Sequence, residues 1–395
     1  MLDATLRNRV QGLLLPSGRS EVPPFMVMDV MAAAERIEAA GGHVIHMEVG
    51  QPAAPAPRTA IAAAAAALQG GRIDYTSALG ILSLRQRIVR HYRDAYGCDV
   101  DAGRIVVTTG SSGAFILAFL AMFEPGDRVA VTVPGYPPYR HILTALGCEP
   151  VLIETTSETR HALTGEALLA AHRKAPLKGV LVGSPANPTG TMMSQDALTS
   201  LIAAAEEGGI RFISDEIYHG LDYAFPAVTA AALSPRALVI NSFSKYFCMT
   251  GWRVGWMVVP EPLVRPIERL QQNLAISVPT LSQVAAEAAF EGRAEMEAIK
   301  RGYLENRRIL IEGLPQAGLT TFLPADGAFY LYADVSAFTS DSFEFAKTML
   351  EQAHVAATPG VDFDPFHGRN FVRFSYARSA EDMRVAVERI ARWLR

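Results

Sequence analysis

The feature that most constrains the fold is a regular alternation of short Val- and Ile-rich runs with longer helical patterns. It extends from about residue 80 to about residue 260 of the 395-residue chain. Strands that alternate with helices in this way form a mainly parallel sheet whose two faces are covered by helices. The sequence therefore predicts a large α/β domain with strands at residues 105–109, 128–133, 151–153, 179–183, 210–214 and 237–241.

The pattern changes after about residue 260. Two helical patterns cover residues 262–270 and 280–314, and short strand-like runs follow near 329–335 and 371–374. Helices and strands without the regular alternation are typical of an α+β domain. We therefore expect a smaller C-terminal domain. We expect three parts in the chain. An N-terminal arm and helix at residues 1–49 join the small domain, the large domain covers residues 50–285, and the small domain itself covers residues 286–395.

Composition limits the kinds of partner. The chain has 36 Lys and Arg against 40 Asp and Glu, whereas proteins that bind nucleic acids normally carry a basic excess. Half of the residues are hydrophobic, which is enough for a large core, but no apolar run is long enough to span a membrane. Cys98, Cys148 and Cys248 are too few and too widely spaced for a disulfide framework or a metal cluster. We expect a cytoplasmic protein with no metal, no nucleic-acid partner and no membrane partner.

Chemically useful side chains follow five of the predicted strands. In a parallel α/β sheet, the loops after the carboxyl ends of the strands lie at one edge and bind ligands there. These loops carry hydroxyls, an aromatic ring, an amide, a carboxylate, an amine and a guanidinium. The residues are Ser111, Ser112, Tyr136, Asn187, Asp215, Tyr218, Ser242, Ser244, Lys245 and Arg253. Such a set suits a cofactor that has a phosphate, an aromatic ring and an aldehyde.

Three motifs in these loops resemble those of the class I/II aminotransferases, which depend on pyridoxal phosphate. They are Asn-Pro-Thr-Gly at 187–190, Asp-Glu-Ile-Tyr at 215–218, and Ser-Phe-Ser-Lys at 242–245 followed by Gly-Trp-Arg-Val-Gly at 251–255. The motifs occur in the order typical of the family, and the resemblance extends from Gly50 to Arg373. It implies the aspartate aminotransferase-like superfamily and fold type I of pyridoxal-phosphate enzymes, in which a large sheet domain carries a smaller α+β domain.

The resemblance implies roles for five residues around the cofactor ring. Lys245 would form a Schiff base with the aldehyde and, once released, move a proton from the substrate Cα. Asp215 would pair with the pyridine nitrogen and strengthen the ring as an electron sink. Tyr218 and Asn187 would donate hydrogen bonds to the phenolic oxygen. Tyr136 would stack on the open face of the ring.

A phosphate site is also implied. Free N–H groups at the start of a helix at residues 111–113 would face the anion, and an arginine would add a permanent cation. The residues concerned are Ser111, Ser112, Gly113, Ser242, Ser244 and Arg253. Tyr75 resembles a tyrosine that, in this family, reaches the phosphate of the other subunit. If it does so here, the protein is a homodimer with shared active sites.

Two further residues are implied to bind the substrate, together with Asn187. Arg373 lies in an apolar run, Phe-Val-Arg-Phe, and resembles the arginine that holds the substrate α-carboxylate. A buried arginine needs an anionic partner, and a carboxylate that accepts two hydrogen bonds meets that need. Gly50 would let the substrate approach the backbone closely.

The function implied is the transfer of an amino group between an L-amino acid and a 2-oxo acid by a ping-pong mechanism. A β-eliminating lyase that cleaves C–S bonds is the alternative, because Lys245, Asp215 and Arg373 serve both reactions. A regulator that binds the cofactor without turnover is less compatible with the chain, because residues 1–49 are too short for a DNA-binding domain.

The substrate side chain is left open by the sequence. Arg19 and Arg378 are candidates to bind a distal carboxylate. Phe25 and Tyr330 would instead line an apolar or aromatic pocket.

Overall fold

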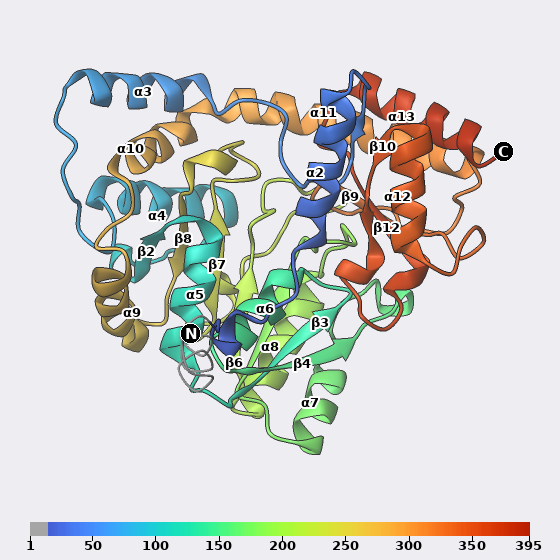
Figure 1. The fold of residues 1–395 in the computed structure, drawn as a ribbon. Coiled ribbons are helices and arrows are strands. Elements are labelled where there is room, and N and C mark those ends of the chain that lie inside the picture. The colour runs from blue at the N-terminus through green and yellow to red at the C-terminus, as the bar shows by residue number, and fades with distance from the viewer. Residues whose placement is uncertain (1–14) are drawn as a thin grey trace, which may run out of the picture.

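The computed structural model describes residues 15–395 and shows a large domain built on one seven-stranded sheet (Figure 1). The strand order is β2-β8-β7-β6-β5-β3-β4. The five adjacent strands β7, β6, β5, β3 and β4 run parallel to one another, whereas β8 is antiparallel to both β2 and β7. The strands are β2 (Ile105–Thr108), β3 (Arg128–Val133), β4 (Glu149–Glu154), β5 (Gly179–Gly183), β6 (Arg211–Asp215), β7 (Leu238–Ser242) and β8 (Gly255–Val258). The predicted α/β fold with a mainly parallel sheet is confirmed.

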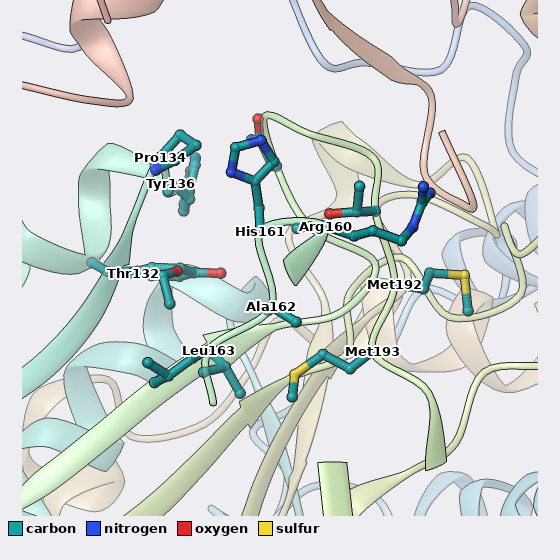
Figure 2. Close-up of a pocket in the computed structure, with 16 residues that line it drawn as sticks. Thr132, Pro134, Tyr136, Arg160, His161, Ala162, Leu163, Met192 and Met193 are labelled. Atoms are coloured by element: carbon teal, nitrogen blue, oxygen red, sulfur yellow. The ribbon is translucent and has the colours of Figure 1, made fainter. Parts of the chain in front are cut away.

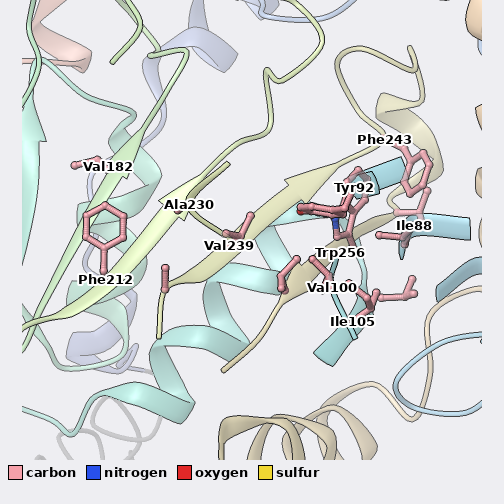
Figure 3. Packing of buried hydrophobic residues seen from close by; sticks show 14 of the residues in the cluster. Ile88, Tyr92, Val100, Ile105, Val182, Phe212, Ala230, Val239, Phe243 and Trp256 are labelled. Carbon is pink, nitrogen blue, oxygen red and sulfur yellow. The ribbon is translucent and has the colours of Figure 1, made fainter. Parts of the chain in front are cut away.

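Helices cover both faces of this sheet because alternate residues of its strands point to opposite sides. In β7, for example, Val239 packs into one hydrophobic cluster and Ile240 into another. Figure 3 shows the first cluster, in which Tyr92 and Trp256 lie against each other. The indole Nε1 donates to the Tyr92 hydroxyl at 3.2 Å. The helices are α3 (Arg58–Gln69), α4 (Leu82–Tyr96), α5 (Gly110–Met122), α6 (Pro137–Ala145), α7 (Gly165–Lys174), α8 (Gln195–Glu207), α9 (Glu261–Leu274) and α10 (Thr280–Ala289).

The smaller domain contains a three-stranded antiparallel sheet, in the order β11-β12-β9, and a two-stranded parallel pair, β1 and β10. Its strands are β1 (Ile45–His46), β9 (Tyr330–Asp334), β10 (Val355–Ala356), β11 (Thr358–Pro359) and β12 (Phe371–Ser375). Its helices are α2 (Met26–Ala39), α11 (Arg293–Gln316), α12 (Ser342–Ala353) and α13 (Ala380–Trp393). Helix α2 contacts β10 and β11. The boundaries at residues 49/50 and 285/286 stay a prediction.

The structure differs from the pattern of the sequence at three elements. The helix expected over 280–314 is divided into α10 and α11 by a short turn at Phe290–Gly292. A Cβ at Gly292 would lie 2.5 Å from a carbon of Pro57, so the chain turns where only a glycine fits against α3. In the apolar stretch at residues 43–49, only the two residues of β1 form a strand. Strand β8 was not predicted, because its short apolar run begins inside the glycine-rich motif at 251–255.

No helix within residues 15–395 is long and apolar enough to cross a membrane.

Candidate active site

Most of the predicted site residues line one cavity of about 240 Å³ at the carboxyl ends of the large-sheet strands, beside the small domain. They come from separate loops of the large domain and from β12 of the small one. The predicted residues at its wall are Gly50, Ser111, Ser112, Tyr136, Asn187, Asp215, Tyr218, Ser244, Lys245, Arg253 and Arg373. Gly113, Ser242 and Tyr75 do not line it, and neither do Arg19 and Arg378.

Lys245 follows β7 and has a buried amine. Its Nζ donates to the backbone carbonyl of Gly50 at 2.5 Å. Burial lowers the pKa of this amine to about 8, and the nearby cations Arg373 and Arg253 contribute to the shift. A substantial share of the amine is therefore neutral near physiological pH, and a neutral amine is the nucleophilic form.

Asp215 ends β6 and is 3% exposed. Burial raises the pKa of its carboxyl to about 6, while hydrogen bonds from Tyr139 and from the N–H of Ile217, and the charge of Lys245, favour the anion. The Tyr139 hydroxyl donates to Oδ2, and the Ile217 N–H donates to Oδ1 at 3.1 Å. Sequence reasoning missed Tyr139. The available signal was its position three residues after Tyr136, which directly precedes α6, because this spacing brings the two rings to one side of the helix start.

Arg373 lies in β12 and is 1% exposed. Its guanidinium carbon lies 4.4 Å from the centre of the Tyr330 ring and 4.7 Å from that of Phe363. Its Nη2 donates to the carbonyl of Glu48 and, at 3.2 Å, to the hydroxyl of Thr358. Within the described residues no carboxylate forms an ion pair with it, and its buried Nε has no hydrogen-bond partner. The charge and the free donor fit an anion from outside the chain.

Asn187 is fixed by the same arginine. Nη1 of Arg373 donates to its Oδ1 at 2.8 Å. Because a guanidinium only donates, the amide oxygen is used in this bond and the NH2 group remains a free donor at the cavity wall.

An anion cradle lies at the first turn of α5, which begins at Gly110. This residue has φ +66°, and a Cβ there would lie 2.6 Å from Nη2 of Arg253. Only a glycine lets the guanidinium lie against the start of the helix. Free N–H groups, the helix dipole and a fixed cation therefore meet at one point.

Two serines contribute to this cradle differently. The Ser242 hydroxyl donates to the Ser244 hydroxyl at 2.9 Å, and the Ser244 N–H donates back to it at 3.1 Å. Ser242 thus lies behind Ser244, whose own proton remains available at the cavity wall.

The arrangement fits pyridoxal phosphate group by group. The α5 cradle suits the phosphate, the Lys245 amine the aldehyde, and the Asp215 carboxylate the ring nitrogen. The free NH2 of Asn187 and the Tyr218 hydroxyl suit the phenolic oxygen. The Tyr136 ring, in edge contact with Phe25 at 5.8 Å between ring centres, lies at the wall where a flat ring would bind.

A neighbouring cavity, shown in Figure 2, shares Tyr136 and Asn187 but is far smaller. Its volume of about 20 Å³ is close to that of one water molecule and cannot hold a substrate. Arg160 at its rim is bound by Asp326, with 2.8 Å to each carboxylate oxygen. This cavity therefore does not compete with the larger one as the site.

Residues 42–390 match the family model of class I and II aminotransferases. The chain belongs to this family. The valine–pyruvate aminotransferase of Mycobacterium tuberculosis is 47% identical over 95% of this chain and 97% of its own length. The (5-formylfuran-3-yl)methyl phosphate transaminase of Methanocaldococcus jannaschii is 34% identical over 94% of this chain and 96% of its own length.

Solved structures agree with this assignment. An aminotransferase from M. tuberculosis superposes with a TM-score of 0.93 at 47% identity, covering 96% of this chain and 99% of its own. The Thermus thermophilus aspartate aminotransferase with maleate gives 0.87 at 32% identity, covering 98% of each chain. The protein is thus a pyridoxal-phosphate-dependent transaminase of fold type I. The similarity does not favour the lyase alternative.

Glu216, directly after Asp215, is a second buried carboxyl that sequence reasoning did not single out. Its Oε1 accepts from the Ala230 N–H at 2.7 Å and the Ser214 hydroxyl at 3.1 Å. Oε2 has no hydrogen-bond partner in the described residues, and Nδ1 of His219 lies 3.5 Å from it. Burial raises the pKa of this carboxyl from 4.5 to about 8, so the folded protein holds a proton on it near neutral pH.

This proton predicts a pH-dependent stability. Between pH 4.5 and about 8 the folded chain binds a proton at Glu216 that the unfolded chain releases, so stability falls as the pH rises through this window. Glu216→Gln, which does not titrate, should show a flatter decline in Tm than the wild type. Thermal unfolding of both proteins from pH 5 to about 8 measures the difference. Equal slopes would show that Glu216 is charged in the folded protein.

Proposed function

We propose that this transaminase moves the amino group of an apolar L-amino acid to pyruvate. Two observations support the proposal. The relative at 47% identity is named a valine–pyruvate aminotransferase. The cavity wall includes the apolar side chains of Phe25, Val27, Met28, Phe115 and Ile217.

The proposed preference for an apolar side chain depends mainly on the charged residues that line the cavity. Its charged lining residues are Asp215, Lys245, Arg253 and Arg373. Since Arg253 serves the phosphate and Arg373 the α-carboxylate, residues 15–395 of this subunit contribute no further cation to the wall for a second carboxylate. A carboxylate buried without a partner is strongly unfavourable, whereas a branched apolar side chain gains about 0.8 kcal/mol for each CH2 group it buries.

The residues then act as follows. Pyridoxal phosphate, when bound, supplies the electron sink that makes the substrate Cα–H acidic. Arg373 and Asn187 would bind the α-carboxylate, and the Lys245 amine would act as the base that moves the proton away from the substrate Cα. Asp215 keeps the ring nitrogen protonated. Phe25, on the chain just before α2, helps to exclude water from the cavity.

The protein is also proposed to be a homodimer with shared active sites. Tyr75 is 79% exposed and lies between α3 and α4, outside the cavity of its own subunit. Exposed apolar side chains occur on the same elements and on the adjoining end of α9, namely Ile61, Leu68, Ile73, Leu82, Leu274 and Ile276. Figure 1 places α3, α9 and α10 at one side of the molecule. An apolar surface of this kind is typical of a subunit interface.

The unpaired state of all three cysteines is compatible with the proposed cytoplasmic location.

Donor choice tests the proposed substrate class. With pyruvate as acceptor, valine, leucine and isoleucine should give kcat/KM values roughly 100-fold above those of aspartate and glutamate, because a distal carboxylate lacks a partner in the cavity. Coupled assays of each donor provide the measurement.

Two controls accompany the donor assay. Release of ammonia and pyruvate from one substrate without an acceptor would indicate the lyase instead. A preference for aspartate would contradict the proposed substrate class, although the protein would remain a transaminase.

Mixed dimers test the shared site. Lys245→Ala and Tyr75→Ala should each give weakly active or inactive homodimers. If Tyr75 serves the opposite subunit, a dimer of one chain of each kind contains one site with both residues intact. Co-expressed chains with two different tags should therefore recover about half of the wild-type activity per dimer.

The activity of the mixed dimer would also show if the shared site is absent. If Tyr75 served its own subunit, neither site of the mixed dimer would be intact, and its activity would not exceed that of the Tyr75→Ala homodimer. The dimer itself is checked independently by sedimentation equilibrium of the wild type.

A further inference from the structure

Tyr218 and Tyr330 form a buried pair of phenols at the wall of the cavity. Their hydroxyl oxygens are 2.7 Å apart, and the residues are 5% and 1% exposed. Tyr218 follows β6 of the large domain, whereas Tyr330 begins β9 of the small domain. In the described part of the chain neither hydroxyl has another hydrogen-bond partner. One proton lies between the two oxygens, and the other remains free.

The surroundings decide which phenol donates. Burial raises the pKa of both phenols, and the charge of Arg373 opposes the rise at both. At Tyr330 only burial outweighs this charge, whereas at Tyr218 the nearby Tyr330 phenol also outweighs it and raises the pKa further. The guanidinium carbon lies 4.4 Å above the Tyr330 ring. A phenol beside a cation is the stronger acid and hence the better donor. Tyr330 therefore donates to Tyr218, and the proton of Tyr218 is left to point into the cavity.

Contacts on several sides hold the Tyr330 ring in place. It meets Tyr218 edge to face, with 5.6 Å between ring centres and 79° between planes, and it contacts Phe329 at 5.0 Å. The hydroxyl lies where a side chain at residue 50 would begin, since a Cβ on Gly50 would be 1.8 Å from it. Gly50 is thus a glycine because the Tyr330 hydroxyl fills this space. Gly50 still lines the cavity, so its expected role in letting the substrate approach the backbone stays a prediction.

We propose that Tyr330 is a positioning residue for the cofactor's phenolic oxygen. By donating to Tyr218 it fixes the direction of the Tyr218 proton and strengthens the hydrogen bond that Tyr218 makes to that oxygen, because successive hydrogen bonds polarise one another. The inference rests on the proposed role of Tyr218 in cofactor binding. Through the contact between Arg373 and its ring, Tyr330 also links the substrate-carboxylate site to the cofactor site.

The test is the pH midpoint of the bound cofactor's absorption change, measured without substrate. A hydrogen bond to the phenolic oxygen stabilises the deprotonated cofactor linkage and lowers this midpoint. Tyr218→Phe should raise it by about one unit or more. Tyr330→Phe, which keeps the ring over Arg373, should raise it by about 0.3–0.5 unit. The double variant should match Tyr218→Phe alone, because Tyr330 acts only through Tyr218.

Tyr332→Phe is the matched control. Tyr332 lies on the same strand, is buried, and has a hydroxyl with no hydrogen-bond partner in the described residues, so its loss should leave the midpoint unchanged. Calorimetric binding of 3-methylbutanoate, the carboxylate of valine without its amine, should be the same for Tyr330→Phe and the wild type. That result shows that Arg373 is undisturbed.

The outcomes separate the two levels of the proposal. No shift in Tyr218→Phe would overturn the proposed role of Tyr218 in cofactor binding. A shift in Tyr218→Phe but none in Tyr330→Phe would overturn the role of Tyr330 alone. Additive shifts in the double variant would also overturn it, because Tyr330 would then act on the cofactor independently.

Discussion

The structure depends on the burial of three charged groups in one cavity without direct ion pairs between them. Lys245, Asp215 and Arg373 are each removed from water, although burying a charge is unfavourable unless other groups compensate for it. The protein compensates with hydrogen bonds from Tyr139 and Ile217 and with the aromatic rings that contact the guanidinium. The shifted pKa values of about 8 for Lys245 and about 6 for Asp215 result from the same burial.

The fold delivers these groups by simple geometry. Parallel strands end at one edge of the sheet, so β6 and β7 bring Asp215 and Lys245 to the same side. Helix α5 begins at that edge and directs its N–H groups at the anion cradle. The small domain adds Arg373 from β12 and Tyr330 from β9, which are adjacent antiparallel strands. The cavity is therefore complete only where the two domains meet.

Much of this arrangement could be predicted from the sequence. Residues that follow strands, such as Asn187, Asp215 and Lys245, stand in ordered motifs, and the topology of a parallel sheet places them together. Contacts that depend on side-chain direction could not be predicted. Tyr139 and the orientation of Tyr330 have no motif, since they are set by packing between helices and strands far apart in the chain. The antiparallel β8 was missed for a related reason, because tertiary pairing with β2 and β7 decides its conformation.

The central claim is that the buried amine of Lys245 binds the cofactor covalently, and it can be measured directly. The chain has five lysines, so a peptide map identifies a modified lysine without ambiguity. Protein purified with pyridoxal phosphate is reduced with borohydride, digested and analysed by mass spectrometry, with Lys245→Ala treated in parallel. The account predicts a pyridoxyl group on the Lys245 peptide and none in the variant. A pyridoxyl group on another lysine, or on no peptide at all, would contradict it.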